Sequence, residues 1–204
     1  MEEPDAIDFI HDGDDRGGVI LKNKSRMTVH ACALLVPLLV ESTSKSLVLI
    51  ALVAATLLYV LSEILRLKGK ELPLITRFTL RLSRDDERTH FVVAPVSLSA
   101  GVILSLLLFP ENIAYASIAT AAVGDLVAAY VGQRFGRTRV GRRTLEGFAA
   151  GLVASFLVAC LWVSPSLAIV GSATGMLFEL AGILDDNLTI PIGAGSAMFI
   201  ASTL

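Results

Sequence analysis

Residues 46–65 read SLVLIALVAATLLYVLSEIL, a stretch with a single charged side chain, Glu63. A helix needs about 20 mostly apolar residues to cross the hydrocarbon core of a bilayer, so this stretch predicts a membrane-spanning helix. The whole chain has the same character, because 54% of its 204 residues are apolar and its mean hydropathy is +0.70. These values exceed those of ordinary soluble domains, and they predict an all-α, polytopic membrane helix bundle.

Further apolar stretches accompany this one and predict about seven transmembrane helices. The first and last stretches are marginal, because Pro37 and Pro191 interrupt them. We expect an acidic cytoplasmic tail over residues 1–26 and a single transmembrane domain over residues 27–204. The expected spans cover residues 27–40, 46–65, 90–109, 113–131, 145–163, 167–184 and 188–204.

The distribution of basic residues predicts the orientation of these spans, since Lys and Arg in short loops stay on the cytoplasmic side of a membrane. With seven crossings and a cytoplasmic N-terminus, 16 of the 17 basic residues fall inside, and only Lys45 falls outside. The outer connections are tight turns, so we expect the active site on the cytoplasmic face. A net charge of −2 gives no basic field that would indicate a nucleic-acid partner.

Asp125 is the clearest candidate for a functional residue. An ionisable group at mid-bilayer costs about 2.5–3.5 kcal/mol on insertion scales, so it needs a partner, a cavity or a function. Small residues recur at helical spacing around it, and such a face usually lets another helix approach closely. That packing role remains an alternative to a ligand site. The small residues are Gly124, Ala128, Ala129, Gly132 and Gly136.

The predicted helix that carries Asp125 continues into an arginine-rich segment and then into the next span at Thr144-Leu-Glu-Gly147. Carboxylates, guanidinium groups and bare backbone are the parts that a Mg²⁺-bound polyphosphate requires. The carboxylates can hold the metal, the arginines can neutralise phosphate oxygens, and the glycines can admit the phosphate chain. The arginines are Arg134, Arg137, Arg139, Arg142 and Arg143.

Other ionisable residues lie near the expected cytoplasmic ends of spans. Glu179 and Asp186 would share a face of an uninterrupted helix, and Pro191 predicts a helix break that exposes backbone carbonyls to a ligand. A plain polar turn over residues 185–187 is the alternative. For Glu63 we expect a structural pairing with Arg66.

These motifs resemble those of a known family, the membrane-bound CTP-dependent lipid-alcohol kinases. The family comprises dolichol or polyprenol kinases, phytol kinases and the fungal type of diacylglycerol kinase, and it is related to the CDP-lipid synthases. The resemblance covers most of residues 24–195. Its main elements are Gly124-Asp125-x-x-Ala128-x-x-x-Gly132-x-x-x-Gly136 with Arg143-Thr144-Leu145-Glu146-Gly147, then Asp186-Asn187-Leu188-Thr189-Ile190-Pro191, and the weaker Arg26-x-x-x-His30 and Glu63-x-x-Arg66.

The resemblance implies phosphoryl transfer from CTP, with Mg²⁺, to the hydroxyl of a membrane lipid alcohol. It favours a polyprenol or dolichol over diacylglycerol. The expected catalytic residues are Asp125, Asp186 and His30; for His30 a neutral, hydrogen-bonded role is the alternative. The expected nucleotide-binding residues are Gly124, Ala128, Gly132, Gly136, Arg143, Glu146, Gly147 and Asn187, and the expected metal ligands are Asp125, Glu146, Glu179 and Asp186.

One departure concerns Arg143, where the family usually has Lys. The positive charge is kept, but a planar fork replaces a point donor. Two other functions stay open at this stage. One is cytidylyl transfer to a lipid phosphate, and the other is a small transporter with acids along its path. A transporter predicts polar residues towards both faces, whereas the outer halves of these spans carry almost no charge. The sequence leaves the oligomeric state open, a homo-oligomer included.

Overall fold

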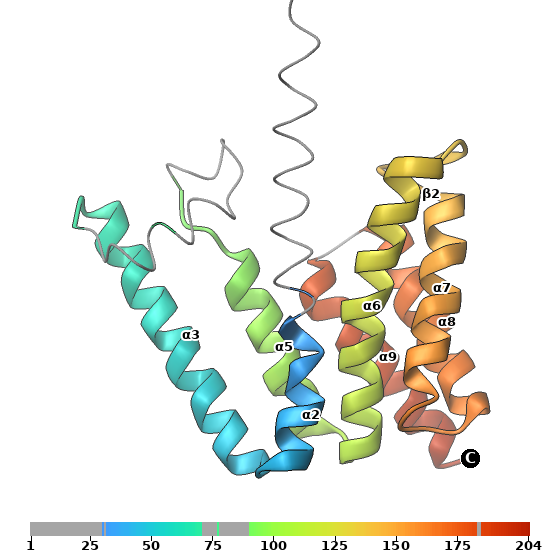
Figure 1. The fold of residues 1–204 in the computed structure, drawn as a ribbon, viewed down its shortest axis with the longest axis horizontal. Helices are drawn as coiled ribbons and strands as arrows, with labels where there is room; N and C mark the ends of the chain where they lie inside the picture. The colour runs from blue at the N-terminus through green and yellow to red at the C-terminus, as the bar shows by residue number, and fades with distance from the viewer. Residues whose placement is uncertain (1–29, 31, 71–76, 78–89, 183–184) are drawn as a thin grey trace, which may run out of the picture.

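The computed structural model describes residue 30, residues 32–70, residue 77, residues 90–182 and residues 185–204. Within these residues the chain forms seven α-helices and one short β-hairpin (Figure 1). The all-α fold class is therefore confirmed. The acidic tail expected over residues 1–26 lies outside the described residues.

Each helix overlaps one of the expected spans. Two of them, α3 and α6, are long and apolar enough to cross a membrane, and α5, α7 and α8 are shorter apolar helices. Seven crossings and a cytoplasmic N-terminus remain predictions. The bounds are α2 Leu35–Ser42, α3 Lys45–Leu67, α5 Ala94–Leu108, α6 Glu111–Phe135, β1 Arg139–Val140, β2 Arg143–Thr144, α7 Leu145–Ala159, α8 Pro165–Ala181 and α9 Asp186–Ser202.

Local sequence signals account for several helix ends. The side chain of Ser44 accepts a hydrogen bond from the N–H of Leu47 at the start of α3, and Thr144 caps Gly147 at the start of α7 in the same way. Such caps satisfy N–H groups that have no partner inside the helix. α8 ends at Gly182, whose φ of 54° is the left-handed conformation that glycine commonly adopts after a helix.

The central helix of the bundle is α6, whereas α3 lies at its edge (Figure 1). In the most apolar stretch of α6, 67% of the residues are buried, compared with 17% in α3. α6 packs against α5, α7, α8 and α9, and α3 mainly contacts α5 and α2. Asp125 therefore lies on the most enclosed helix in the described part of the chain.

Successive helices run in opposite directions, so the connections gather at two ends of the bundle (Figure 1). The end of α3, the hairpin and the α8–α9 connection lie at one end. The α2–α3, α5–α6 and α7–α8 turns lie at the other, together with Lys45 at the start of α3. This arrangement is compatible with the grouping of basic residues expected from the sequence.

The helix break expected at Pro191 is absent, because α9 continues from Asp186 to Ser202. Proline removes the hydrogen bond to the carbonyl four residues earlier, which here belongs to Asn187. α5 approaches this carbonyl so closely at Gly101 that a Cβ on Gly101 would overlap the Asn187 oxygen. A neighbouring helix thus covers the carbonyl, and the prediction of exposed backbone at a break is wrong.

Candidate active site

Three acidic side chains surround the guanidinium of Arg143. Its Nη1 lies 3.3 Å from Glu179 Oε1 and 3.7 Å from Asp125 Oδ1. Its Nη2 donates a hydrogen bond to Asp186 Oδ2. The acids come from α6, the end of α8 and the start of α9, so the fold brings three distant segments to one cation. We call these four residues the Arg143 cluster.

Asp125 also has a partner in His30, whose Nε2 lies 3.6 Å from Asp125 Oδ2. Both residues are buried, with 7% and 9% of their surfaces exposed. Imidazole beside a carboxylate is a common arrangement for proton transfer near neutral pH. The structure thus brings His30, Asp125 and Asp186 into one neighbourhood, and their catalytic roles remain predictions.

The β1–β2 hairpin places Arg143, and the sequence analysis did not predict it. Val140 pairs with Arg143, and Gly141 opens the tight connection between the two strands with a φ of 58°. Glycine adopts this left-handed conformation without strain, and it is favoured in short hairpin turns. The signal was present in Val140-Gly141-Arg142, but strands of two residues are too short for alternation of apolar and polar residues to reveal them.

The Arg143 cluster contains more acidic than basic side chains. Three carboxylates share one guanidinium, and two of their buried oxygens, Glu179 Oε2 and Asp186 Oδ1, have no hydrogen-bond partner among the described residues. Burial alone would lower the pKa of Arg143, but attraction by Glu179, Asp186 and Asp125 outweighs burial and raises it. Arg143 therefore stays charged, and the two partnerless carboxylate oxygens leave room for a further cation or a proton.

The carboxylates of the Arg143 cluster fit the chemistry of a magnesium site. Mg²⁺ prefers oxygen ligands, and Asp125, Glu179 and Asp186 supply them, including the two partnerless oxygens. In the described part of the chain, no three acidic, histidine or cysteine side chains already surround a common point at metal-binding distance. Arg143 lies between the acids and is their common partner in this structure, and their role as metal ligands remains a prediction.

Glu179 and Asp186 meet, although not along one helix face. α8 ends at Ala181 and α9 begins at Asp186, so the two acids flank the turn between antiparallel helices. Both contact Arg143 from there. The uninterrupted helix considered for this region is wrong, because the left-handed Gly182 ends α8.

The small-residue face of α6 packs against α7. A Cβ at Gly132 would lie 2.7 Å from Thr144 Oγ1, and one at Gly147 would lie 2.6 Å from the carbonyl oxygen of Ala128. These distances leave no space for side chains, so the small residues permit the close approach of two helices. Nucleotide contact remains a prediction for these residues: Gly124, Ala128, Gly132, Gly136 and Gly147.

Glu146 lies apart from the Arg143 cluster, since none of the cluster's ion pairs involves it. The N–H of Thr138 donates to both of its carboxylate oxygens, at 3.1 and 3.2 Å. This contact ties the first turn of α7 to the segment between α6 and β1. The geometry gives Glu146 a part in holding the hairpin, while its predicted nucleotide and metal contacts remain predictions.

The polar residues 185–187 at the start of α9 comprise two structural residues and one that reaches the cluster. Asp185 caps α9, because its Oδ1 accepts a hydrogen bond from the N–H of Asn187 at 3.0 Å. The Asn187 side chain donates to Ser97 Oγ at 3.3 Å and so links α9 to α5. Asp186 alone of the three contacts Arg143. The sequence analysis missed Ser97, whose sole signal was a hydroxyl in the first turn of an apolar helix.

Glu63 and Arg66 form the structural pair expected from the sequence. Arg66 Nε and Nη2 donate to the two carboxylate oxygens of Glu63 at 2.9 and 2.8 Å. The N–H of Val92 donates to Glu63 Oε2 at 3.1 Å, and Arg66 also donates to the carbonyl of His90. The pair therefore fastens the end of α3 to the segment that leads into α5.

Comparison with known proteins points to one class of enzyme. The chain is 32% identical over 131 residues to Dolichol kinase EVAN of Arabidopsis thaliana, with 53% of this chain and 22% of the plant protein covered. It thus spans about a fifth of that relative's length. No protein-family model and no solved structure matches the chain. The similarity to the plant enzyme confirms the resemblance to the lipid-alcohol kinase family that the sequence motifs indicated.

Proposed function

We propose that this protein is a CTP-dependent kinase that phosphorylates the hydroxyl of a membrane lipid alcohol. One observation carries the proposal. The residues of the two strongest sequence motifs, Asp125 with Arg143 and Asp186, lie around one point together with Glu179. The similarity to a dolichol kinase supports the reaction class.

Arg143 is the residue best placed to bind the triphosphate. A guanidinium can donate two parallel hydrogen bonds to phosphate oxygens. In the proposed complex it leaves its carboxylate partners for the phosphates, which frees Asp125, Glu179 and Asp186 for other ligands. The neighbouring Arg142 and Arg139 lie in the same exposed hairpin and add positive charge near the incoming nucleotide.

The transfer itself needs a base. The lipid hydroxyl oxygen forms a bond to the γ-phosphorus, the bond between the γ-phosphorus and the bridging oxygen breaks, and CDP leaves. The hydroxyl proton passes to a carboxylate of the Arg143 cluster or to His30, which lies 3.6 Å from Asp125. Either acceptor lies in the Arg143 cluster or next to it.

Mg²⁺ is the proposed cofactor, with Asp125, Glu179 and Asp186 as its protein ligands and Glu146 as a further candidate. The ion would neutralise charge on the phosphate oxygens. We expect chelation of Mg²⁺ to abolish turnover and added Mg²⁺ to restore it. Full activity in the presence of a chelator would contradict this part of the proposal.

A polyprenol or dolichol is the proposed acceptor, favoured over diacylglycerol because the relative's name specifies dolichol. We further propose a multi-pass membrane location with the site on the cytoplasmic side. This membrane is the cell membrane in a prokaryote or the endoplasmic reticulum in a eukaryote. The location is supported by the apolar helices and by the basic residues of the hairpin at the end where the Arg143 cluster lies.

A panel of nucleoside triphosphates and lipid alcohols, analysed by thin-layer chromatography, tests the proposal. We expect CTP with a polyprenol to give CDP and a polyprenyl phosphate. Release of pyrophosphate with a lipid phosphate acceptor would indicate a CDP-lipid synthase instead. Flux of an ion or solute into liposomes that persists in Asp125→Ala, without any phosphorylated product, would indicate a transporter.

A further inference from the structure

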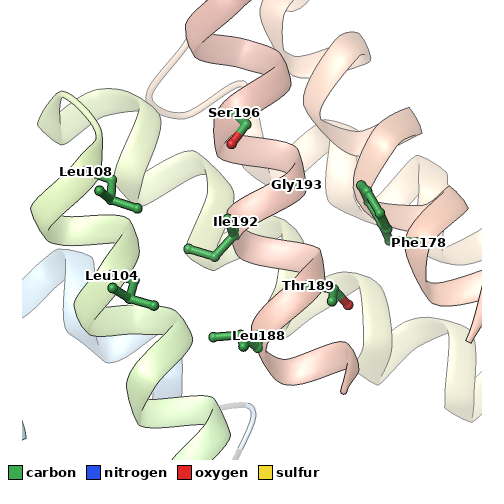
Figure 2. Close-up of a pocket in the computed structure, with 8 residues that line it drawn as sticks. All are labelled: Leu104, Leu108, Phe178, Leu188, Thr189, Ile192, Gly193 and Ser196. Atoms are coloured by element: carbon green, nitrogen blue, oxygen red, sulfur yellow. The ribbon is translucent and has the colours of Figure 1, made fainter. Parts of the chain in front are cut away.

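An apolar groove of about 490 Å³ runs over the outward face of α9, between α5 and α8 (Figure 2). α9 contributes a continuous face from Leu188 to Ser196, α5 contributes Leu104 and Leu108, and α8 contributes Phe178. The lining side chains are hydrocarbon except for the hydroxyls of Thr189 and Ser196, and Gly193 contributes no side chain. The groove can therefore hold a hydrocarbon chain but offers little to a polar ligand.

The groove begins next to the Arg143 cluster, because two helices contribute adjacent residues to both. On α8, Phe178 lines the groove and Glu179 contacts Arg143. On α9, Asp186 contacts Arg143, and Leu188 and Thr189 in the same helical turn line the groove. A chain lying in the groove at this end would bring its head close to the carboxylates.

Close helix contacts give the groove its walls. α5 touches α9 at Gly101, beside Asn187, and its groove-lining residues start one turn further along at Leu104. On the other side, the absence of a side chain at Gly193 lets the ring of Phe178 lie against α9, since a Cβ there would overlap the ring. Along α9, the distance from Asp186 to Ser196 is about 15 Å at 1.5 Å per residue.

We propose that this groove binds the hydrocarbon tail of the lipid alcohol and so directs its hydroxyl to the Arg143 cluster. The inference rests on the proposed function and adds the position of the acceptor to it. A tail gains little hydrophobic free energy on moving from the bilayer into the groove, because lipid chains are as apolar as leucine. The groove acts by orienting the hydroxyl for reaction, and orientation affects rate strongly.

Photocrosslinking of the full-length protein tests where the tail lies. The probe is a polyprenol with a photoreactive diazirine in its tail, placed in phosphatidylcholine nanodiscs. We expect crosslinks at the α5, α8 and α9 residues that line the groove, and we expect unlabelled polyprenol to compete for them. Crosslinks spread over other lipid-facing helices, or equal competition by added phosphatidylcholine, would overturn the proposal.

Groove-filling variants test the consequence for turnover. Ser196→Trp obstructs the groove from α9 and Leu104→Trp obstructs it from α5, and Val153→Trp on the exposed face of α7 is the matched control. We expect both groove variants to lower kcat/KM for a long polyprenol about tenfold or more relative to a short isoprenoid alcohol, with the KM for CTP unchanged. An equal loss with both alcohols, or the same effect in Val153→Trp, would overturn the proposal.

The two readouts separate this inference from the function on which it rests. One outcome is that polyprenol competes for the groove crosslinks but the wild-type protein forms no phosphorylated lipid. This outcome would contradict the kinase proposal and support the lipid site. The opposite outcome is phosphorylated lipid together with crosslinks outside the groove. It would support the kinase proposal and contradict the proposed tail site. The crosslinking uses the wild-type chain, so it stands even where a tryptophan variant fails to fold.

Discussion

Among the residues that the structure describes, two acid–arginine groups differ in how far their charges are satisfied. The Glu63–Arg66 pair between α3 and α5 has one acid and one arginine, and both carboxylate oxygens accept hydrogen bonds. In the Arg143 cluster three acids share one arginine, and two carboxylate oxygens lack a partner among the described residues.

The difference separates a structural charge from a functional one. A buried carboxylate whose two oxygens both have partners has no capacity left to bind a ligand. Removal of one member of such a pair leaves an uncompensated buried charge and lowers stability. A cluster with more acids than basic groups and with partnerless oxygens has capacity left for a cation or a proton. The two groups would look alike in a count of acids on apolar helices, so the partners of the acids distinguish them.

The largest effect is expected from Asp125→Asn, which keeps the shape of the side chain but removes its charge from the Arg143 cluster. We expect turnover to fall by about a thousandfold, the upper range for loss of one preorganised electrostatic group at an active site. The assay is steady-state phosphorylation of polyprenol by purified protein. A thermal unfolding midpoint near that of the wild type would show that the variant is folded, and unchanged turnover would remove Asp125 from the mechanism.

A somewhat smaller effect is expected at Arg143, where charge and geometry can be separated. Arg143→Ala should lower kcat/KM for CTP by about a hundredfold, because it removes the cation proposed to bind phosphate. Arg143→Lys should recover much of this loss, since it keeps the charge without the planar fork. Kinetics at varied CTP concentration measure both variants. Equal activity of the alanine and lysine variants would argue against a charge-dependent role.

Glu63→Gln should lower the stability of the protein and leave its turnover nearly unchanged. It removes the carboxylate to which Arg66 and the N–H of Val92 donate, so we expect a loss of about 1–3 kcal/mol in unfolding free energy. Turnover per folded molecule should stay close to that of the wild type, because the pair is separate from the Arg143 cluster. Equilibrium unfolding in detergent and active-fraction kinetics give the two numbers. A large loss of turnover at full stability would make Glu63 a functional acid as well.

The smallest effect is expected from Glu146→Gln. Its carboxylate is bonded to the N–H of Thr138 and lies outside the Arg143 cluster, so the variant should retain most of its turnover. The Mg²⁺ concentration for half-maximal activity should not change. A strong rise in that concentration would instead identify Glu146 as a metal ligand, as the sequence analysis expected.

The sequence was most informative about the helices. Long apolar stretches set the positions of α3 and α6, and even the marginal last stretch forms the continuous helix α9. The proximity of Asp125, Arg143 and Asp186 followed from their motifs, because each motif lies near the same end of an antiparallel helix. The pairing of Glu63 with Arg66 followed from their spacing of three residues.

Other features depend on contacts between distant segments, which the sequence does not encode locally. In the sequence, the glycines near Asp125 fit helix packing and a ligand site equally well. The structure shows that α7 packs against them. At Pro191, where α9 continues, Gly101 of α5 lies against the carbonyl of Asn187, which proline leaves without its helical hydrogen bond. The groove beside Phe178 arises from the relative placement of three helices, and no motif in the sequence marks it.

The most direct test of the central claim follows the phosphorus atoms of CTP. Purified protein in nanodiscs with polyprenol is given CTP labelled at the γ-phosphate in one reaction and at the α-phosphate in another. We predict label in the lipid from the γ-phosphate alone, retained in Glu63→Gln per folded molecule and lost in Asp125→Asn. Label in the lipid from the α-phosphate, or γ-label transfer that survives Asp125→Asn, would contradict the assignment of the Arg143 cluster as a phosphoryl-transfer site.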